Sequence, residues 1–188
     1  MLYDQSKFMK TYFYSILCTL LSSLSLVHFG NNYEIIEDYN IRFSTDRAAG
    51  TFRGLTGRVE FDTENIENST MDVAVSVSTI KTGNKTKDRH ARKSKWFDAK
   101  KYPSISFISN SIAINGNQYT ANGVLTIKDV SEETEIDFTV ESDDEVPYLI
   151  GSMIINREQY NINGDSFAFL VGEDVTVDLR IPANYTNL

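Results

Sequence analysis

The chain has 188 residues, a length that suits one domain with a sizeable buried core. Its hydrophobic content of 41% and charged content of 23% are ordinary for a globular protein and argue against a chain that is disordered throughout. The formal net charge of -8 argues against a general nucleic-acid binder, because such a protein needs a basic face to displace counterions from phosphates.

The first segment, residues 1–30, has the pattern of a secretory signal peptide. Lys7 and Lys10 precede an uncharged apolar run over residues 12–29. We therefore expect an exported protein, periplasmic or otherwise secreted, with its folded domain over residues 33–183. An uncleaved membrane anchor is the alternative, because the run approaches the length that spans a bilayer.

After the leader, apolar and polar residues alternate with a period of two between clusters of Gly, Asn and Asp, which predicts antiparallel strands. Such patterns predict about eight strands, at residues 55–61, 71–77, 105–107, 112–114, 125–127, 136–140, 150–154 and 175–181. In the seventh of these, Ile150 and Ile154 mark the apolar face. Strands at this spacing, without long helices between them, predict an all-β sandwich or barrel, and alternation alone does not separate the two.

One segment, residues 81–103, interrupts the strands. Nine of the 18 Lys and Arg residues fall within residues 81–101 against two Asp, so this basic segment carries about +7 and the remainder about -15. We expect a short helix or loop insertion around residues 84–101. Trp96 and Phe97 would hold it to the barrel, since so basic a run needs an apolar anchor to stay ordered.

A set of short motifs runs through the basic segment and the predicted strands. They are Thr82-Gly83-Asn84, Asp88, Trp96-Phe97-Asp98, Tyr102-Pro103, Phe107, Gly50-Thr51-Phe52 with Gly54 and Gly57, Gly123-Val124-Leu125-Thr126-Ile127-Lys128, Asn156-Arg157 with Tyr160, and the strand from Val175 to Ile181. In order and spacing they resemble the signature of the YceI-like polyisoprenoid-binding proteins over about residues 33–183. The sequence departs from that signature at Lys87, Ala91 and Asp129, where the family has Arg, Leu and Gly.

The resemblance implies an eight-stranded antiparallel lipocalin-like barrel that carries or sequesters a long isoprenoid lipid, a quinone or a polyprenyl compound, as its ligand. The residues expected to line the apolar interior are Phe52, Val73, Val75, Val77, Phe107, Leu125, Ile127, Phe138 and Val177. The residues expected at the pore mouth or lipid headgroup are Trp96, Phe97, Tyr102, Lys87 and Arg157. The alternative is a solid β-sandwich, an interaction or adhesion domain in which the same apolar residues fill a core.

The mouth candidates each have a second interpretation. The aromatic residues either line the mouth or fasten the basic segment to the barrel. Arg157 either meets a headgroup or forms a structural ion pair. Lys87 bears on headgroup recognition because Lys cannot form the forked pair with phosphate that Arg forms. The basic segment is either a solvated face, a transient contact with an anionic membrane surface, or a contact with a phosphate headgroup.

Catalysis finds little support in the residue types. The predicted leader contains Cys18 and His28, which leaves His90 as the only histidine and no thiol in the cleaved chain. Cys–His pairs and metal sites rich in Cys or His are then impossible. We expect no enzyme, no cofactor, and no metal site, with a solvated acidic turn at residues 143–145. A lipid hydrolase dependent on His90 ranks last, and the sequence leaves a homodimer open.

Overall fold

The computed structural model describes residues 39–143, 146–164 and 171–187. The chain divides into two units, Met1–Glu37 and Asp38–Leu188, and the described residues all belong to the second. The predicted signal peptide lies outside the described residues. The elements in chain order are β1 (Asn40–Ser44), β2 (Ala49–Glu60), the 3-10 helix η1 (Ile66–Asn68), β3 (Thr70–Lys81), α2 (Lys85–Ala91), β4 (Ser104–Asn115), β5 (Gln118–Ile127), β6 (Val130–Asp143), β7 (Val146–Asn156), β8 (Asp174–Pro182) and β9 (Asn184–Asn187).

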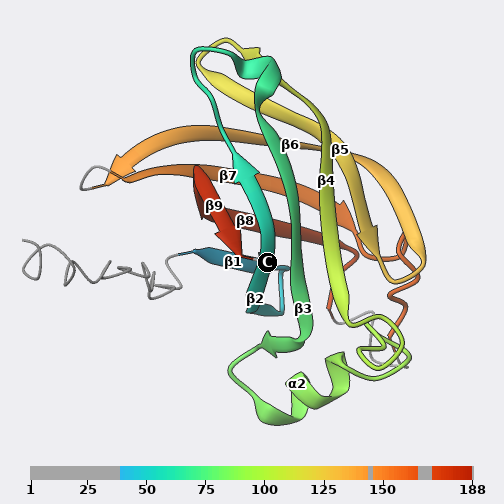
Figure 1. Cartoon of the computed structure of the whole chain (residues 1–188). Helices are drawn as coiled ribbons and strands as arrows, with labels where there is room; N and C mark the ends of the chain where they lie inside the picture. Colours follow the sequence, from blue (N-terminus) through green and yellow to red (C-terminus); the bar gives the residue numbers. More distant parts are fainter. Residues whose placement is uncertain (1–38, 144–145, 165–170, 188) are drawn as a thin grey trace, which may run out of the picture. The chain divides into compact units, whose positions relative to one another are not determined.

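The strands form one antiparallel sheet that closes on itself (Figure 1). Each strand from β2 to β7 pairs with the next in the chain, and β1 pairs with both β8 and β2. β1 uses only the first part of β2, from Ala49 to Phe52, so the second part from Gly57 to Glu60 pairs with β9. The prediction of an all-β, eight-stranded antiparallel barrel with a short helix is confirmed, with β9 as an added strand beside β2.

The eight barrel strands are not the eight segments that alternation predicts. Residues 105–107 and 112–114 belong to one strand, β4, whose pairing with β5 shifts register between Ser109 and Ser111. The shift changes the phase of the alternation, so that Phe107 and Ile112 are both 5% exposed and both join the core. Alternation does not predict β1 or β9, because strands of five and four residues hold too few apolar positions to show a period.

A second irregularity lies between β2 and β3. Their register shifts on both sides of Arg53, whose backbone N–H donates to the hydroxyl of Thr79 at 2.9 Å instead of to a strand carbonyl. Gly54 follows with a φ of 67°, a conformation that a residue with a Cβ rarely adopts. The last buried residue of β3 is Ile80, which is even-numbered, whereas the buried residues before it, Met71, Val75 and Val77, are odd-numbered.

The two ends of the barrel are built differently (Figure 1). At the end with the β2–β3 and β4–β5 turns, the Phe61 ring packs edge-on against Tyr119 at 4.9 Å and Phe138 at 5.6 Å between centroids. Phe61 and Phe138 are buried, and Tyr119 packs against them, so this aromatic cluster is part of the core at that end. The opposite end carries α2 and the rest of the basic segment.

Candidate functional site

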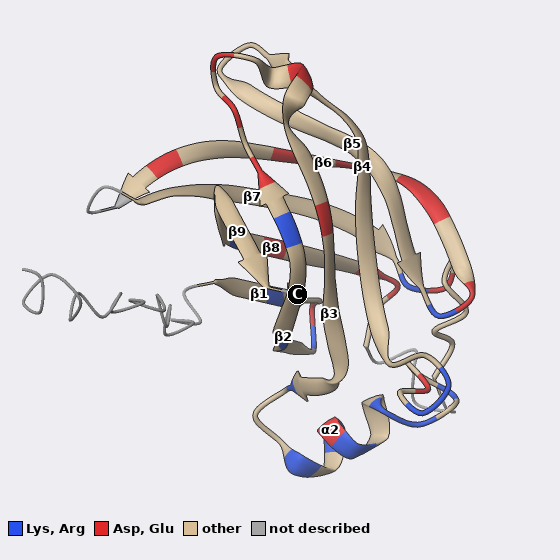
Figure 2. Cartoon of the chain, viewed as in Figure 1, with Lys and Arg blue, Asp and Glu red and all other residues tan. Residues whose placement is uncertain are grey.

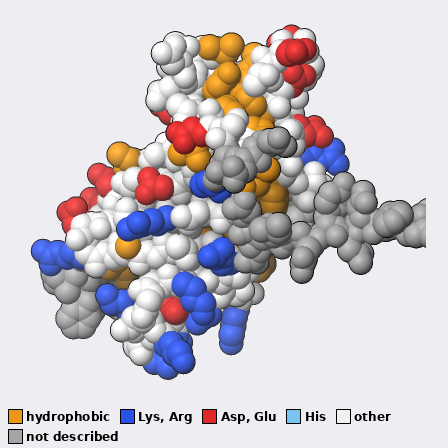
Figure 3. All heavy atoms as spheres, turned by 90° about the vertical axis from the view of Figure 1, so that its left-hand side faces the viewer, with side chains coloured by type: hydrophobic (Ala, Val, Ile, Leu, Met, Phe, Trp, Pro, Cys, Tyr) orange, Lys and Arg blue, Asp and Glu red, His pale blue; other side chains and the backbone are white. Residues whose placement is uncertain are grey.

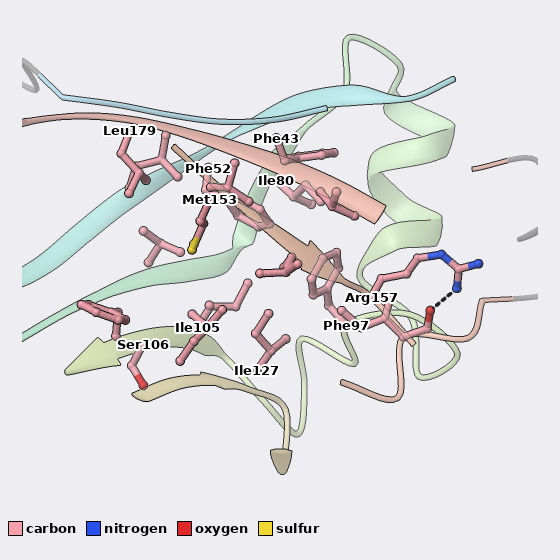
Figure 4. Close-up of a pocket in the computed structure, with 18 of the residues that line it drawn as sticks. Phe43, Phe52, Ile80, Phe97, Ile105, Ser106, Ile127, Met153, Arg157 and Leu179 are labelled. Atoms are coloured by element: carbon pink, nitrogen blue, oxygen red, sulfur yellow. Dashed lines mark hydrogen bonds between the residues drawn. The ribbon is translucent and has the colours of Figure 1, made fainter. Parts of the chain in front are cut away.

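The barrel contains a cavity of about 520 Å³ between the aromatic cluster and α2. All eight barrel strands contribute apolar side chains to its wall, and Figure 4 shows Phe52, Met153 and Leu179 among them. The volume lies within the roughly 300–1,000 Å³ of small-molecule sites. A closed barrel with an internal cavity contradicts the alternative prediction of a solid β-sandwich.

Most of the residues predicted to face the interior lie on the cavity wall. They are Phe52, Val73, Val75, Phe107, Leu125, Ile127, Phe138 and Val177. Val77, which the sequence also predicts to face the interior, is 1% exposed but lies outside the cavity wall and the main core cluster. Its backbone N–H donates to the carbonyl of Pro103 at 2.8 Å, close to the irregularity that ends the odd-numbered alternation of β3.

The apolar face of β7 is also opposite to the predicted one. Leu149, Met153 and Ile155 line the cavity, whereas Ile154 is 71% exposed. Both faces of this strand are apolar, so its composition gave no signal for the choice. Leu179, which also lines the cavity, was missed although it continues the alternation of Val175 and Val177.

The wall becomes polar and basic at the α2 end. Among the described lining residues, the ionisable ones are Arg47, Lys87, His90 and Arg157, and none is a carboxylate. Trp96 and Phe97 line the same cavity, and the Phe97 ring packs edge-on against Phe52 with 5.8 Å between centroids. We call this end the mouth. The contact of these residues with a headgroup stays a prediction.

Tyr102, which the sequence predicts at the mouth, is not among the residues that line the cavity. Its hydroxyl donates to the carboxylate of Asp129 at 2.9 Å, and the Nζ of Lys101 lies 4.7 Å from its ring centroid. This hydrogen bond is the main reason that the pKa of Asp129 lies below its ordinary value. Tyr102 fastens the end of the basic segment to the β5–β6 turn, as the second interpretation of the aromatic residues expected.

Arg157 organises the segment that follows β7. Its side chain is 5% exposed and donates to the carbonyls of Gly172, at 2.6 Å, and Ile162, while its guanidinium lies 3.4 Å from the carboxylate of Glu158. Figure 4 shows it at the edge of the cavity close to Phe97. The structural ion pair is therefore present, and the same side chain forms part of the wall.

The motif residues from Thr82 to Asp88 shape the start of α2. The side-chain oxygen of Asn84 accepts from the backbone N–H groups of Thr86, at 2.9 Å, and Lys87, at 3.1 Å, which caps the helix. The buried carboxylate of Asp88 accepts from the hydroxyl and the backbone N–H of Thr82, both at 2.7 Å. These bonds turn the chain from β3 directly into the helix, so this part of the motif has a structural role.

The anchor at Asp88 should depend on pH. The hydroxyl of Thr82, and after it the Thr82 backbone N–H, hold the pKa of Asp88 below its ordinary value. A group with a lowered folded pKa stabilises the fold above its unfolded pKa of about 4 and loses that contribution as the pH falls through the folded pKa. We expect the NMR shift of the Thr82 amide to titrate below pH 4 and to lose this step in Asp88→Asn. A step at or above pH 4 would contradict the assignment.

Comparison with known proteins places the chain in a family. A model of the YceI-like domain matches residues 33–183. The chain belongs to the YceI-like family. The UPF0312 protein plu2095 of Photorhabdus laumondii is 29% identical over 83 residues, which are 44% of this chain and 43% of that protein. The match thus spans less than half of that protein.

Two solved structures share the barrel of this YceI-like protein. BcnA of Burkholderia cenocepacia matches with a TM-score of 0.72 and 24% identity, over 77% of this chain and 96% of that one. A domain from Saccharophagus degradans, described as a polyisoprenoid binding domain, matches with a TM-score of 0.52 and 10% identity, over 76% of this chain and 90% of that one. At these identities the likeness concerns the fold alone.

Within residues 39–143, 146–164 and 171–187, no helix is both long and apolar enough to cross a membrane. In the same ranges, no group of three or more His, Cys, Asp and Glu is placed to hold a metal ion. The acidic turn considered as a calcium site includes residues 144 and 145, which lie outside these ranges.

Proposed function

We propose that this YceI-like protein binds an isoprenoid lipid, a quinone or a polyprenyl compound, inside its barrel and carries or sequesters it without catalysis. The apolar cavity of about 520 Å³ carries the proposal. An apolar tail gains roughly 25 cal/mol per Å² of surface removed from water, so it needs no polar partner inside. The fold shared with the polyisoprenoid binding domain from Saccharophagus degradans supports the choice of lipid.

The size of the cavity limits how much of a tail it holds. If each carbon of the tail occupies roughly 30 Å³, the volume of a water molecule, the cavity holds on the order of 17 carbons. This corresponds to about three isoprene units. The aromatic cluster of Phe61, Tyr119 and Phe138 is part of the core at the far end. We therefore propose that a longer tail, and any headgroup, leaves the cavity at the mouth beside α2.

We also propose that the protein acts after export to the periplasm or a similar compartment. The support is the signal-peptide pattern of residues 1–30, with its lysines ahead of an uncharged apolar run. Sequencing the N-terminus of the protein recovered from its native host tests this proposal. A chain recovered in the cytosol that still begins at Met1 would contradict it.

Lipid extraction is the direct test of the binding proposal. The full chain, produced in its native host, is extracted with organic solvent, and the extract is analysed by mass spectrometry. We expect an isoprenoid mass in near-stoichiometric amount. Repeated recovery of the protein with no lipid, or with acyl lipids only, would contradict the proposal.

Trp96 offers a second test, because it is the only tryptophan in the chain and lines the cavity. We expect a short-tailed quinone to quench its fluorescence, since the quinone ring accepts energy or electrons from a nearby indole. A saturated alcohol with the same carbon count should displace the quinone and restore the emission. Quenching that the alcohol does not reverse would place the quinone outside the cavity.

A further inference from the structure

The basic segment presents nearly all of its positive charge to solvent. The exposed cations are Lys81, Lys85, Lys87, Arg89, Lys93, Lys95, Lys100 and Lys101. The remaining one, Arg92, is half-buried and donates to the backbone carbonyls of Asp88 and Ser78. Among the described residues, the ion pairs are Arg58 with Glu60 and Arg157 with Glu158, so no carboxylate of a described residue lies within 4.0 Å of the eight exposed cations.

The two acidic residues of the segment, Asp88 and Asp98, form no ion pair with its exposed cations. Asp88 is 4% exposed and directs its carboxylate to Thr82, and Asp98 is half-buried. Figure 2 shows Lys and Arg gathered on α2 and the loop after it. Figure 3 shows acidic side chains at the opposite end, where the β2–β3 turn carries Asp62, Glu64 and Glu67. Positive charge is therefore concentrated on the basic segment at the α2 end.

The cavity mouth lies at this basic end. Lys87, His90 and Ala91 of α2 line the cavity, and so does Trp96 of the following loop. Trp suits a boundary that is apolar on one side and wet on the other. The charged surface and the mouth of the cavity thus lie side by side.

We propose that the basic segment docks the barrel, α2 end first, on an anionic phospholipid bilayer, so that the mouth faces the membrane. Surface fields decay within about 10 Å at 0.1 M salt, so only this end is attracted although the whole chain is acidic. Docking places the mouth next to the bilayer, which gives the lipid of the proposed function a path into the cavity. Only this purpose of docking rests on the proposed function. The lysine and arginine side chains would bind the phosphate groups of the lipids.

The test uses the full chain and two kinds of vesicle, phosphatidylcholine alone and phosphatidylcholine with phosphatidylglycerol. We expect cosedimentation with the anionic vesicles in excess of that with the neutral ones, and we expect salt to abolish the excess. Each basic residue near such a surface strengthens binding about fivefold. Lys85→Gln combined with Lys95→Gln, two exposed residues outside the cavity wall, should weaken the excess about 25-fold.

Arg42→Gln combined with Arg58→Gln is the matched control. These two exposed residues lie on β1 and β2, outside the basic segment, and their loss changes the net charge equally. We expect less than a twofold effect. Equal weakening in both double variants, or binding that is the same on neutral vesicles and in high salt, would overturn docking through the basic segment. Lipid extraction is independent of these measurements, so either proposal can fail alone.

Discussion

Val177→Phe should weaken lipid binding on the order of tenfold to a hundredfold while the barrel stays folded. Val177 pairs with Phe43 on β1 and Met153 on β7, and all three side chains line the cavity. The added ring occupies space that the tail needs, and each methylene kept out of the cavity forfeits about 0.8 kcal/mol. Titration with a quinone, followed by the fluorescence of Trp96, measures the loss.

Val124→Phe is the control for this variant. Val124 lies on β5 between Gly123 and Leu125, is half-buried, and is not part of the cavity wall. The same increase in side-chain volume should leave lipid binding unchanged. If Val177→Phe binds as tightly as the parent protein at an unchanged melting temperature, the lipid lies elsewhere and the cavity is not the binding site.

Arg157→Met should destabilise the barrel by about 3 kcal/mol, measured by chemical denaturation. The substitution leaves the carbonyls of Gly172 and Ile162 without their buried donor, and hydrogen bonds to a charged group each contribute about 1.5–3 kcal/mol. Arg157→Lys should lose less, because it keeps the charge but cannot reach both carbonyls with one planar fork.

Arg58→Met is the matched comparison for Arg157. Its guanidinium lies 3.1 Å from Glu60 in an exposed pair, with half of the Arg58 side chain accessible to solvent. Exposed pairs contribute about 0–1 kcal/mol, so this variant should be close to the parent protein. A similar loss of stability in both variants would show that Arg157 has no special role in holding the segment after β7.

The candidate site could be predicted in part because period-two alternation reports which side chains share a face. Val73, Val75, Leu125 and Ile127 lie on regular stretches of β3 and β5, and all four line the cavity. The pattern does not place Val77 correctly, because alternation holds only while the register of the strand pair holds. The pairing of β3 with β2 shifts before Ile80. The pattern does not show which face of β7 points inward, because both of its faces carry apolar side chains.

The sequence does not predict the bonding partners of the mouth residues, because these partners lie in distant parts of the chain. Tyr102 and Trp96 are close in sequence and equally suited to a wet boundary, yet Tyr102 bonds to Asp129, 27 residues away, and Trp96 lines the cavity. Arg157 takes the carbonyl of Gly172, 15 residues away. Residue types give the bonding capacity of such groups, and only the folded chain brings the partner within reach.

By itself, the sequence determined that the described unit is all-β, that a short helix or loop around residues 84–101 interrupts the strands, and that the positive charge is concentrated there. These are local properties of composition and period. The closure of the barrel through β1, the phase changes at Ser109 and Arg53, and the cavity were decided by tertiary structure. Alternation is the same for a filled and a hollow interior, because it records which way a side chain points and not what lies opposite it.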